Sequence, residues 1–157
     1  MGFFDLLNED CIEPNLNAED KFNAIQQLLE LLDQHDMLKN KDVALQDVIE
    51  REQYLSTGLE NGLAIPHAKT EGVTELVLSF GISKQGIDFE TLDGKPAHFI
   101  FCMLSPKDTS GPHLKALGQI TKTFRTEGIY DALLNASGKE EIKKILNDFN
   151  ERSNPQV

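Results

Sequence analysis

Apolar residues recur at helical spacing in two stretches near the start of the chain. In residues 18–34, after the suitable N-cap Asn17, one helix face collects Phe22, Ile25, Leu28, Leu29 and Leu32. In residues 41–53, one face collects Ala44, Leu45, Val48 and Ile49. The pattern predicts two amphipathic helices, with His35 on the surface at the end of the first.

Short apolar runs after the second helix have the length and composition of strands. They cover residues 63–65, 76–82 and 98–104. The last run is apolar on both faces, which is typical of a strand in the middle of a sheet covered by helices. Gln85-Gly86 and Asp93-Gly94 are turn signals, and we predict a short strand over residues 87–89 between them.

The remaining segments lie at the two ends of the chain. Residues 1–17 are predicted to form a short N-terminal segment whose apolar residues Phe3, Phe4, Leu6 and Leu7 pack against the rest of the domain. Helical patterns follow the last strand over residues 112–125, 129–136 and 138–149, and we expect the polar residues 150–157 to be disordered. Because helices alternate with strands, the chain is predicted to be a single α/β domain over residues 1–149, with a mostly parallel sheet between helix layers.

Composition narrows the range of partners. The formal net charge of -11 at pH 7 argues against binding to nucleic acid or to an anionic membrane surface. No apolar run reaches the roughly 18 residues of a membrane span, and the first residues lack the basic start of a signal peptide. We therefore expect a cytoplasmic protein without membrane insertion. Cys11 and Cys102 are too few for a disulfide framework.

Candidate chemistry is concentrated around His67. Pro66 has a fixed φ and favours an extended Ile65, so a strand ending there would hold His67 in one orientation. Gly58 and Gly62 allow turns or close backbone approach. A histidine in such a place is either a hydrogen-bonded structural residue or one aimed at a ligand, and this stretch alone leaves both readings open.

A second histidine is predicted to reach the same edge of the sheet. His113 lies in the first turn of the helix that follows the central strand, so both histidines follow carboxyl ends of strands. Free N–H groups near Gly111-Pro112-His113 would form an anion site there. An imidazole nucleophile beside an anion site suits phosphoryl transfer. The chain has no GxxxxGK[ST] motif, so the phosphoryl group is expected from another phosphoprotein.

Arg51 and Glu52 close the second helix just before this stretch. An Arg-Glu pair at a helix end is usually a solvated ion pair that contributes under about 1 kcal/mol. The alternative is that Arg51 turns inward toward His67. The spacing of the residues alone does not decide between these two orientations of Arg51.

These motifs together resemble a known family. Arg-Glu at 51–52, Ser-Thr-Gly at 56–58 and Gly-Leu-Ala-Ile-Pro-His at 62–67 resemble the active-site signature of the IIA components of the bacterial phosphoenolpyruvate:sugar phosphotransferase system, fructose–mannitol class. Asp88-Phe89, Asp93-Gly94-Lys95-Pro96 and Pro-His-Leu-Lys-Ala-Leu at 112–117 resemble the same family. The resemblance implies an α/β fold with a mainly parallel mixed sheet flanked by helices.

The resemblance also implies roles for individual residues. His67 matches the histidine that carries the phosphoryl group through Nε2, and His113 matches a second histidine that assists transfer. Arg51 matches an arginine that steadies the phosphoryl charge. Ser56 and Thr57 match a hydroxyl pair expected to hydrogen-bond the phosphoryl group.

Partners follow from the same resemblance. The donor would be the histidine phosphocarrier protein, and the acceptor a cysteine of a IIB component, with no cofactor. The alternative is a regulatory IIA-like protein whose phosphorylation state controls partner binding, since a phosphoryl group adds about -1.5 to -2 charges. A metal enzyme using His67, His98 and His113 is disfavoured, because the spacing of these histidines is not that of metal ligands; we expect His98, which opens its strand, to be structural.

Overall fold

The computed structural model describes residues 2–153. The chain begins with two 3-10 helices and a short strand: η1 (Phe3–Leu6), η2 (Glu9–Cys11) and β1 (Ile12–Glu13). Two helices and four strands follow: α1 (Lys21–Gln34), α2 (Lys41–Tyr54), β2 (Leu63–Ala64), β3 (His67–Lys69), β4 (Val77–Ile87) and β5 (Ala97–Ser105). The described chain ends with three helices: α3 (Ser110–Phe124), α4 (Ile129–Leu134) and α5 (Lys139–Ser153).

The strands form one mixed sheet, as the resemblance implies. Its order is β1-β4-β5-β2, with β3 also paired to β5. β1 pairs in parallel with β4, and β2 and β3 pair in parallel with β5. The two longest strands, β4 and β5, pair antiparallel. β2 and β3 run in the same direction as β5, and β3 ends at the same edge of the sheet as β5, because Lys69 pairs with Ser105.

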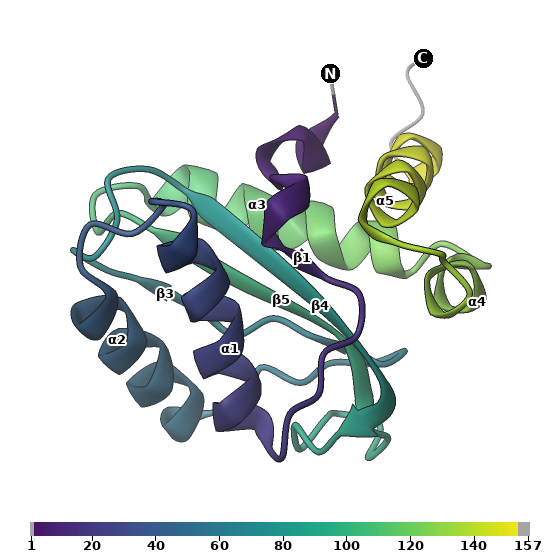
Figure 1. Ribbon diagram of the computed structural model, residues 1–157, viewed down its shortest axis with the longest axis horizontal. Coiled ribbons are helices and arrows are strands. Elements are labelled where there is room, and N and C mark those ends of the chain that lie inside the picture. The colour runs from purple at the N-terminus through teal and green to yellow at the C-terminus, as the bar shows by residue number, and fades with distance from the viewer. Residues whose placement is uncertain (1, 154–157) are drawn as a thin grey trace.

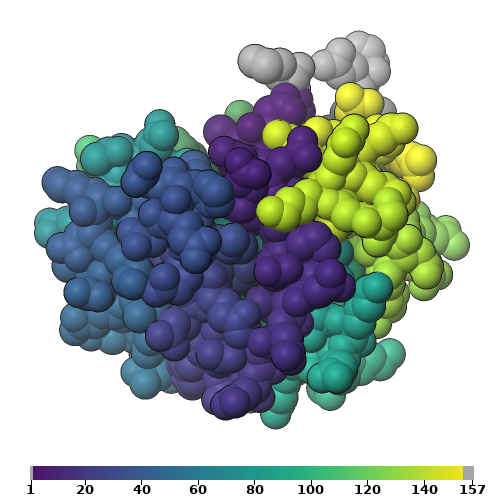
Figure 2. Space-filling model, viewed as in Figure 1, coloured from purple at the N-terminus to yellow at the C-terminus, as the bar shows by residue number. Residues whose placement is uncertain are grey.

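Helices cover both faces of the sheet. Figure 1 shows α1 and α2 on one face and α3 on the other. The two ends of the described chain meet, because η1 packs against α5; in Figure 2 the N-terminal segment (purple) lies against the C-terminal helix (yellow-green). Between the layers, the ring of Phe101 stacks on Phe80 with centroids 4.2 Å apart and meets the edge of Phe124. Every residue of β5 except His98 is buried, as its apolar run predicts.

Several boundaries differ from the sequence prediction. α1 begins at Lys21 rather than residue 18, because the side chain of Asp20 accepts a hydrogen bond from Asn23 N and caps the helix in place of Asn17. The expected turn at Gln85-Gly86 is an irregularity inside β4: the register shifts between Ile82 and Ile87, and Gly86 has φ 85°. The chain therefore continues as one strand to Ile87, whereas Asp93-Gly94 does form a turn.

The two ends of the chain also correct the prediction. Leu6 was expected to pack in the core but is 49% exposed, whereas Phe4 and Leu7 are fully buried. Disorder from residue 150 is wrong for residues 150–153, because α5 continues to Ser153 and Asn150 is buried. The side chain of Asn150 donates to Gln119 and Thr123 of α3, which holds the end of α5 in place. The rest of the predicted tail, 154–157, lies outside the described residues.

No helix among residues 2–153 is both long enough and apolar enough to cross a membrane. Both cysteines are buried and free, and burial raises the pKa of Cys102 to about 12. A thiol with that pKa stays protonated at neutral pH, so Cys102 packs as an apolar side chain.

Candidate functional site

His67 lies where the chain passes from one short strand to another. β2 ends at Ala64, Pro66 interrupts the ladder, and β3 begins at His67 itself. The carbonyl of Pro66 accepts a hydrogen bond from Met103 N at 3.0 Å, and His67 pairs with Met103 in register. The histidine is thus the first residue of a strand rather than the residue after one, and the central strand fixes its backbone.

The ring of His67 is oriented through Nδ1. This atom lies 2.6 Å from the carbonyl oxygen of Ile65. A carbonyl oxygen only accepts hydrogen bonds, so Nδ1 carries the proton in the neutral ring. Nε2 is therefore the nitrogen with a free lone pair. Burial lowers the pKa of His67 below its ordinary value of 6.5, which keeps the ring neutral at pH 7.

His113 faces His67 from the other side of the site. It is the fourth residue of α3, it is buried, and its ring centroid lies 5.4 Å from that of His67. Its Nδ1 is hydrogen-bonded to the hydroxyl of Ser105, the last residue of β5. Burial, and secondarily the electrostatic influence of His67 and Lys69, lower the pKa of His113 to about 4. Both rings are therefore neutral at physiological pH, and the structure brings them together as the sequence predicts.

Two cations lie beside the histidines. Arg51, in the last turn of α2, lowers the pKa of His67 through its charge, and its Nη1 donates to the carbonyl of Leu55 at 2.7 Å. The Nζ of Lys69 donates to the hydroxyl of Ser110 at 2.5 Å, which ties β3 to the start of α3. Lys69 was not singled out from the sequence, where it reads as part of a polar turn. In a chain of net charge -11, this pair brings two positive charges to the histidines.

The start of α3 adds further donors. The N–H groups of Ser110 and Gly111 lie in the first turn, where a helix has no internal carbonyl partner for them. Pro112 has no N–H, and the N–H of His113 is bonded to the Thr109 carbonyl at 3.3 Å. The expected anion site thus has two backbone donors, the N–H groups of Ser110 and Gly111. They lie at the positive end of the dipole of a fifteen-residue helix.

Glu52 does not form the solvated pair with Arg51 that a helix end normally carries. It is 1% exposed, and its carboxylate accepts hydrogen bonds from Thr57 N at 2.9 Å, from the Thr57 hydroxyl and from Lys21 Nζ at 3.4 Å. The charge of Glu52 raises the pKa of His67, opposite to the effect of Arg51. No local sequence pattern signals this burial, because Lys21 and Glu52 are 31 positions apart.

The hydroxyls of Ser56 and Thr57 are used within the protein. Ser56 donates to the carbonyl of Phe89, and Thr57 donates to the carboxylate of Glu52. A phosphoryl oxygen needs donors, and the single hydroxyl proton of each residue already has an acceptor. Both hydroxyl protons are thus directed to partners within the protein, and Thr57 is linked to the segment that carries His67 through its carbonyl, which accepts from Ile65 N at 3.1 Å.

The other two histidines lie elsewhere. His35 ends α1 and is exposed, as predicted. His98 is near the start of β5, roughly 17 Å along the strand from Met103, the register partner of His67. Its Nδ1 lies 2.7 Å from the carbonyl oxygen of Ser83. Because of that separation, His67, His98 and His113 cannot ligate one metal ion, and residues 2–153 hold no cluster of three or more His, Cys, Asp or Glu side chains suited to a metal.

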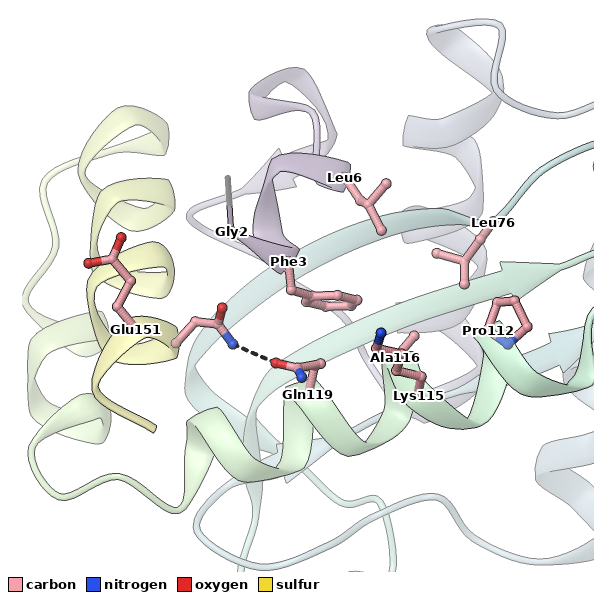
Figure 3. A pocket seen from close by; sticks show the side chains of 10 residues that line it. Gly2, Phe3, Leu6, Leu76, Pro112, Lys115, Ala116, Gln119 and Glu151 are labelled. Carbon is pink, nitrogen blue, oxygen red and sulfur yellow. Dashed lines mark hydrogen bonds between the residues drawn. The ribbon is translucent and has the colours of Figure 1, made fainter. Parts of the chain in front are cut away.

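A large surface cavity lies on a different side of α3. It has a volume of about 1100 Å³ and opens between η1, α3 and α5 (Figure 3), with an apolar floor formed by Phe3, Leu6, Leu76, Pro112 and Ala116. None of the four histidines lines it. Pro112 precedes His113, so the cavity and the histidine pair occupy neighbouring parts of the same helix.

The chain is similar to proteins of a known family. The family model of the phosphoenolpyruvate-dependent sugar phosphotransferase system, EIIA 2, matches residues 5–149. The fructose-specific EIIABC component of the phosphotransferase system of Bacillus subtilis (strain 168) is 35% identical over 147 residues, which are 94% of this chain. The fructose-specific EIIA component of Haloferax volcanii is 35% identical over 126 residues, 80% of this chain and 82% of that protein.

Further matches carry a different name. A nitrogen regulatory protein of Bradyrhizobium diazoefficiens is 30% identical over 150 residues, 93% of this chain and 95% of that protein. The crystal structure of nitrogen regulatory protein IIA-Ntr from Neisseria meningitidis superposes with a TM-score of 0.79 at 27% identity, covering 90% of this chain and 97% of the other.

The extent of the matches differs between relatives. The chain spans only 23% of the length of the Bacillus protein, whereas it covers most of the nitrogen regulatory proteins and of the Haloferax EIIA component. The match to the family model covers nearly the whole chain and includes both histidines of the site. The chain therefore belongs to the EIIA 2 family of the phosphoenolpyruvate-dependent sugar phosphotransferase system.

Proposed function

We propose that this protein is a phosphoryl carrier in which Nε2 of His67 accepts a phosphoryl group from the histidine phosphocarrier protein and passes it to a cysteine of a IIB component. The observation that carries the proposal is the 2.6 Å contact between His67 Nδ1 and the Ile65 carbonyl. That contact leaves the lone pair on Nε2, and the lowered pKa of His67 keeps it unprotonated at neutral pH. A neutral, oriented imidazole is what an attack on phosphorus requires.

The transfer balances without a cofactor. The Nε2 lone pair of His67 forms an N–P bond as the N–P bond of the donor phosphohistidine breaks, and the donor imidazole keeps the released electron pair. The proton on Nδ1 stays on the hydrogen bond to Ile65 throughout. In the return step a cysteine thiolate of the acceptor forms an S–P bond, and the electron pair of the broken N–P bond returns to Nε2.

Charge around the phosphoryl group comes from several elements. A loose transition state spreads charge over three equatorial oxygens, so positioning and neutralisation do most of the work. Arg51 and Lys69 supply positive charge, and the N-terminus of α3 supplies amide donors. His113 acts as a neutral hydrogen-bonding partner, because its pKa of about 4 keeps it uncharged. Ser56 and Thr57 contribute by fixing the loop that follows α2 rather than by direct contact with the phosphoryl group.

Exposed apolar side chains border the site and suit docking of protein partners. Tyr54 and Leu55, which end α2 after Arg51, are 87% and 63% exposed, and Leu114, next to His113, is 68% exposed. Apolar residues of this size flanking a reactive histidine favour a macromolecular donor and acceptor over a small-molecule substrate.

A regulatory role is the second candidate function. The identity to nitrogen regulatory proteins over nearly their full length favours it. In this role the same phosphorylation at His67 would add charge and acceptor oxygens next to Leu55 and Leu114 and so change which partner docks. The chemistry at His67 is common to both candidates, and only the fate of the phosphoryl group differs.

Intact-protein mass spectrometry tests the shared step. The protein is incubated with phosphoenolpyruvate, enzyme I and the histidine phosphocarrier protein, alongside His67→Ala and, as a matched control, the exposed-histidine variant His35→Ala. We expect one acid-labile phosphoryl group on the native chain and on His35→Ala, and none on His67→Ala. A phosphoryl group that survives the loss of His67 would contradict the proposal.

Adding a panel of purified IIB components to the phosphorylated protein separates the two candidates. Loss of the phosphoryl group to a IIB cysteine supports the sugar-directed carrier. Retention of the group in the presence of every IIB component, together with partner binding that differs between the two phosphorylation states, supports the regulatory role.

A further inference from the structure

The carboxylate of Glu52 is buried, and neither histidine is among its hydrogen-bond partners. All its hydrogen bonds are to residues of the fold: Oε2 accepts from Thr57 N at 2.9 Å and from Lys21 Nζ at 3.4 Å, and Oε1 accepts from the Thr57 hydroxyl. A buried carboxylate is costly unless it is paired and hydrogen-bonded. Here both oxygens are satisfied, and two of the three bonds go to one residue of the loop after α2.

A continuous series of hydrogen bonds leads from this carboxylate to the imidazole of His67. Thr57 N donates to Glu52, and the Thr57 carbonyl accepts from Ile65 N at 3.1 Å. The Ile65 carbonyl in turn accepts from His67 Nδ1 at 2.6 Å. Thr57 is therefore held at its N–H by Glu52 and at its C=O by the residue whose own carbonyl orients the histidine ring.

The Glu52 carboxylate also contacts a buried lysine. Lys21, the first residue of α1, is 9% exposed, and its Nζ bonds both Glu52 and Glu90, the latter at 2.9 Å. Burial acts to lower the pKa of Lys21, but the hydrogen bonds that Nζ donates to Glu90 and Glu52, together with the charges of these carboxylates, outweigh it and raise the pKa, so the ammonium stays charged. Through Lys21, the Glu52 carboxylate that holds Thr57 is thus connected to α1 and to the segment that follows β4.

The geometry points to Glu52 as a positioning residue of the phosphoryl-transfer site: it fixes Thr57, and through Thr57 and Ile65 it keeps the proton of neutral His67 on Nδ1 and the lone pair on Nε2. This inference rests on the proposed function of His67 as the phosphoryl acceptor. Glu52 does not touch the reacting atoms and is not a catalytic residue. If the Ile65 carbonyl moves away, either ring nitrogen can carry the proton, and the molecules with the proton on Nε2 cannot attack phosphorus.

A purely structural role for Glu52 predicts something different. Loss of a buried, hydrogen-bonded carboxylate lowers the stability of any fold, but it leaves the tautomer of a folded histidine unchanged. The ¹⁵N chemical shifts of the two imidazole nitrogens of His67, read above its pKa at about pH 8, report which nitrogen carries the proton. This readout needs no phosphoryl donor, so it tests the positioning role separately from the carrier function.

The experiment compares Glu52→Ala and Glu52→Gln with two controls. Glu50→Ala removes an exposed carboxylate of the same helix, which accepts a hydrogen bond from the side chain of Gln46 on α2. Thr57→Val removes the hydroxyl bond to Glu52 but keeps the Thr57 N–H. Glu52→Gln keeps one acceptor oxygen for that N–H but turns an amide NH₂ group toward Lys21 or Thr57.

We expect both controls to keep the native pattern, with the proton of His67 on Nδ1. In Glu52→Ala, His67 should show a mixture of tautomers, and the phosphorylation rate should fall about tenfold. In Glu52→Gln, both the share of the second tautomer and the fall in rate should be intermediate. Native nitrogen shifts and a native rate in whichever Glu52 variant remains folded by circular dichroism would overturn the positioning role. If the native protein shows the Nδ1–H tautomer but accepts no phosphoryl group, the proposed function fails while the positioning role stands.

Discussion

The imidazole rings of His67 and His113 lie with their centroids 5.4 Å apart and their planes at 54°. Each ring is anchored through Nδ1, His67 on the Ile65 carbonyl and His113 on the Ser105 hydroxyl. The two anchors come from different elements, the segment between β2 and β3 and the end of β5. Both rings are thus held through Nδ1, and neither of these two contacts uses Nε2.

Removal of the second imidazole tests its part in transfer. We expect His113→Ala to remain competent for phosphorylation at His67 but to lower the rate by about a hundredfold, because a preorganised donor to the phosphoryl oxygens is lost. The rate is measured by rapid-quench mass spectrometry against His35→Ala, which changes an exposed histidine. A native rate in folded His113→Ala would show that the ring only fills space.

Stability is expected to depend on pH through the same residue. Burial lowers the pKa of His113 from 6.5 to about 4, so the unfolded chain binds more protons than the folded one between these values. The stabilisation that depends on neutral His113 is therefore complete above about pH 6.5 and is lost as the pH falls toward 4. A shift of this size corresponds to a contribution on the order of 3 kcal/mol.

The measurement is denaturant unfolding of the native protein and of His113→Gln at pH 7 and pH 4.5. Carboxylates titrate in both proteins, so the difference between them isolates the histidine. The free energy of unfolding should fall more steeply with acidification in the native protein. Parallel pH dependence in the two proteins would contradict the assigned burial effect.

Opposite charges next to His67 should shift its pKa in opposite directions. Arg51 lowers the pKa of His67 and Glu52 raises it. Arg51→Gln is therefore expected to raise the pKa measured by NMR titration and Glu52→Gln to lower it. Arg51→Gln should also slow phosphorylation by about a hundredfold, since it removes a cation from the phosphoryl site. Shifts of the same sign in the two variants would show that at least one of the two charges does not act on the ring as described.

Removing the Ser56 hydroxyl distinguishes a role in stability from direct contact with the phosphoryl group. Its bond to the Phe89 carbonyl implies that Ser56→Ala loses about 1 kcal/mol of stability, because a partly buried acceptor is left without its donor. We expect the phosphorylation rate to stay within about threefold of native, since the hydroxyl proton is not directed at His67. A large fall in rate at unchanged stability would restore the direct phosphoryl contact implied by the family resemblance.

The main elements and the histidine pair could be predicted because local signals agreed with the tertiary structure. The apolar run ending at Leu104 is the buried centre of the sheet, and Pro66 does fix the segment that carries His67. His113 was predictable from topology, since β3 and β5 are parallel and end at the same edge.

Other features depend on contacts between distant parts of the chain, which local patterns do not contain. Glu52 is buried only because Lys21 and Thr57 satisfy it, and a glutamate beside an arginine at a helix end reads as solvent-exposed. Gly86 takes a positive φ inside β4, where the same residue type equally suits a turn. Hydrogen bonds from the Asn150 side chain to α3 hold the end of α5 in place, although the sequence at this end of the helix is polar.

The most direct test of the carrier mechanism is to locate the phosphoryl group on the imidazole of His67 by ³¹P and ¹⁵N NMR of the phosphorylated, ¹⁵N-histidine-labelled protein. The mechanism predicts phosphorus coupled to Nε2 of His67, with Nδ1 still protonated and bonded to the Ile65 carbonyl. Phosphorus coupled to Nδ1 of His67, or to His113, would contradict it.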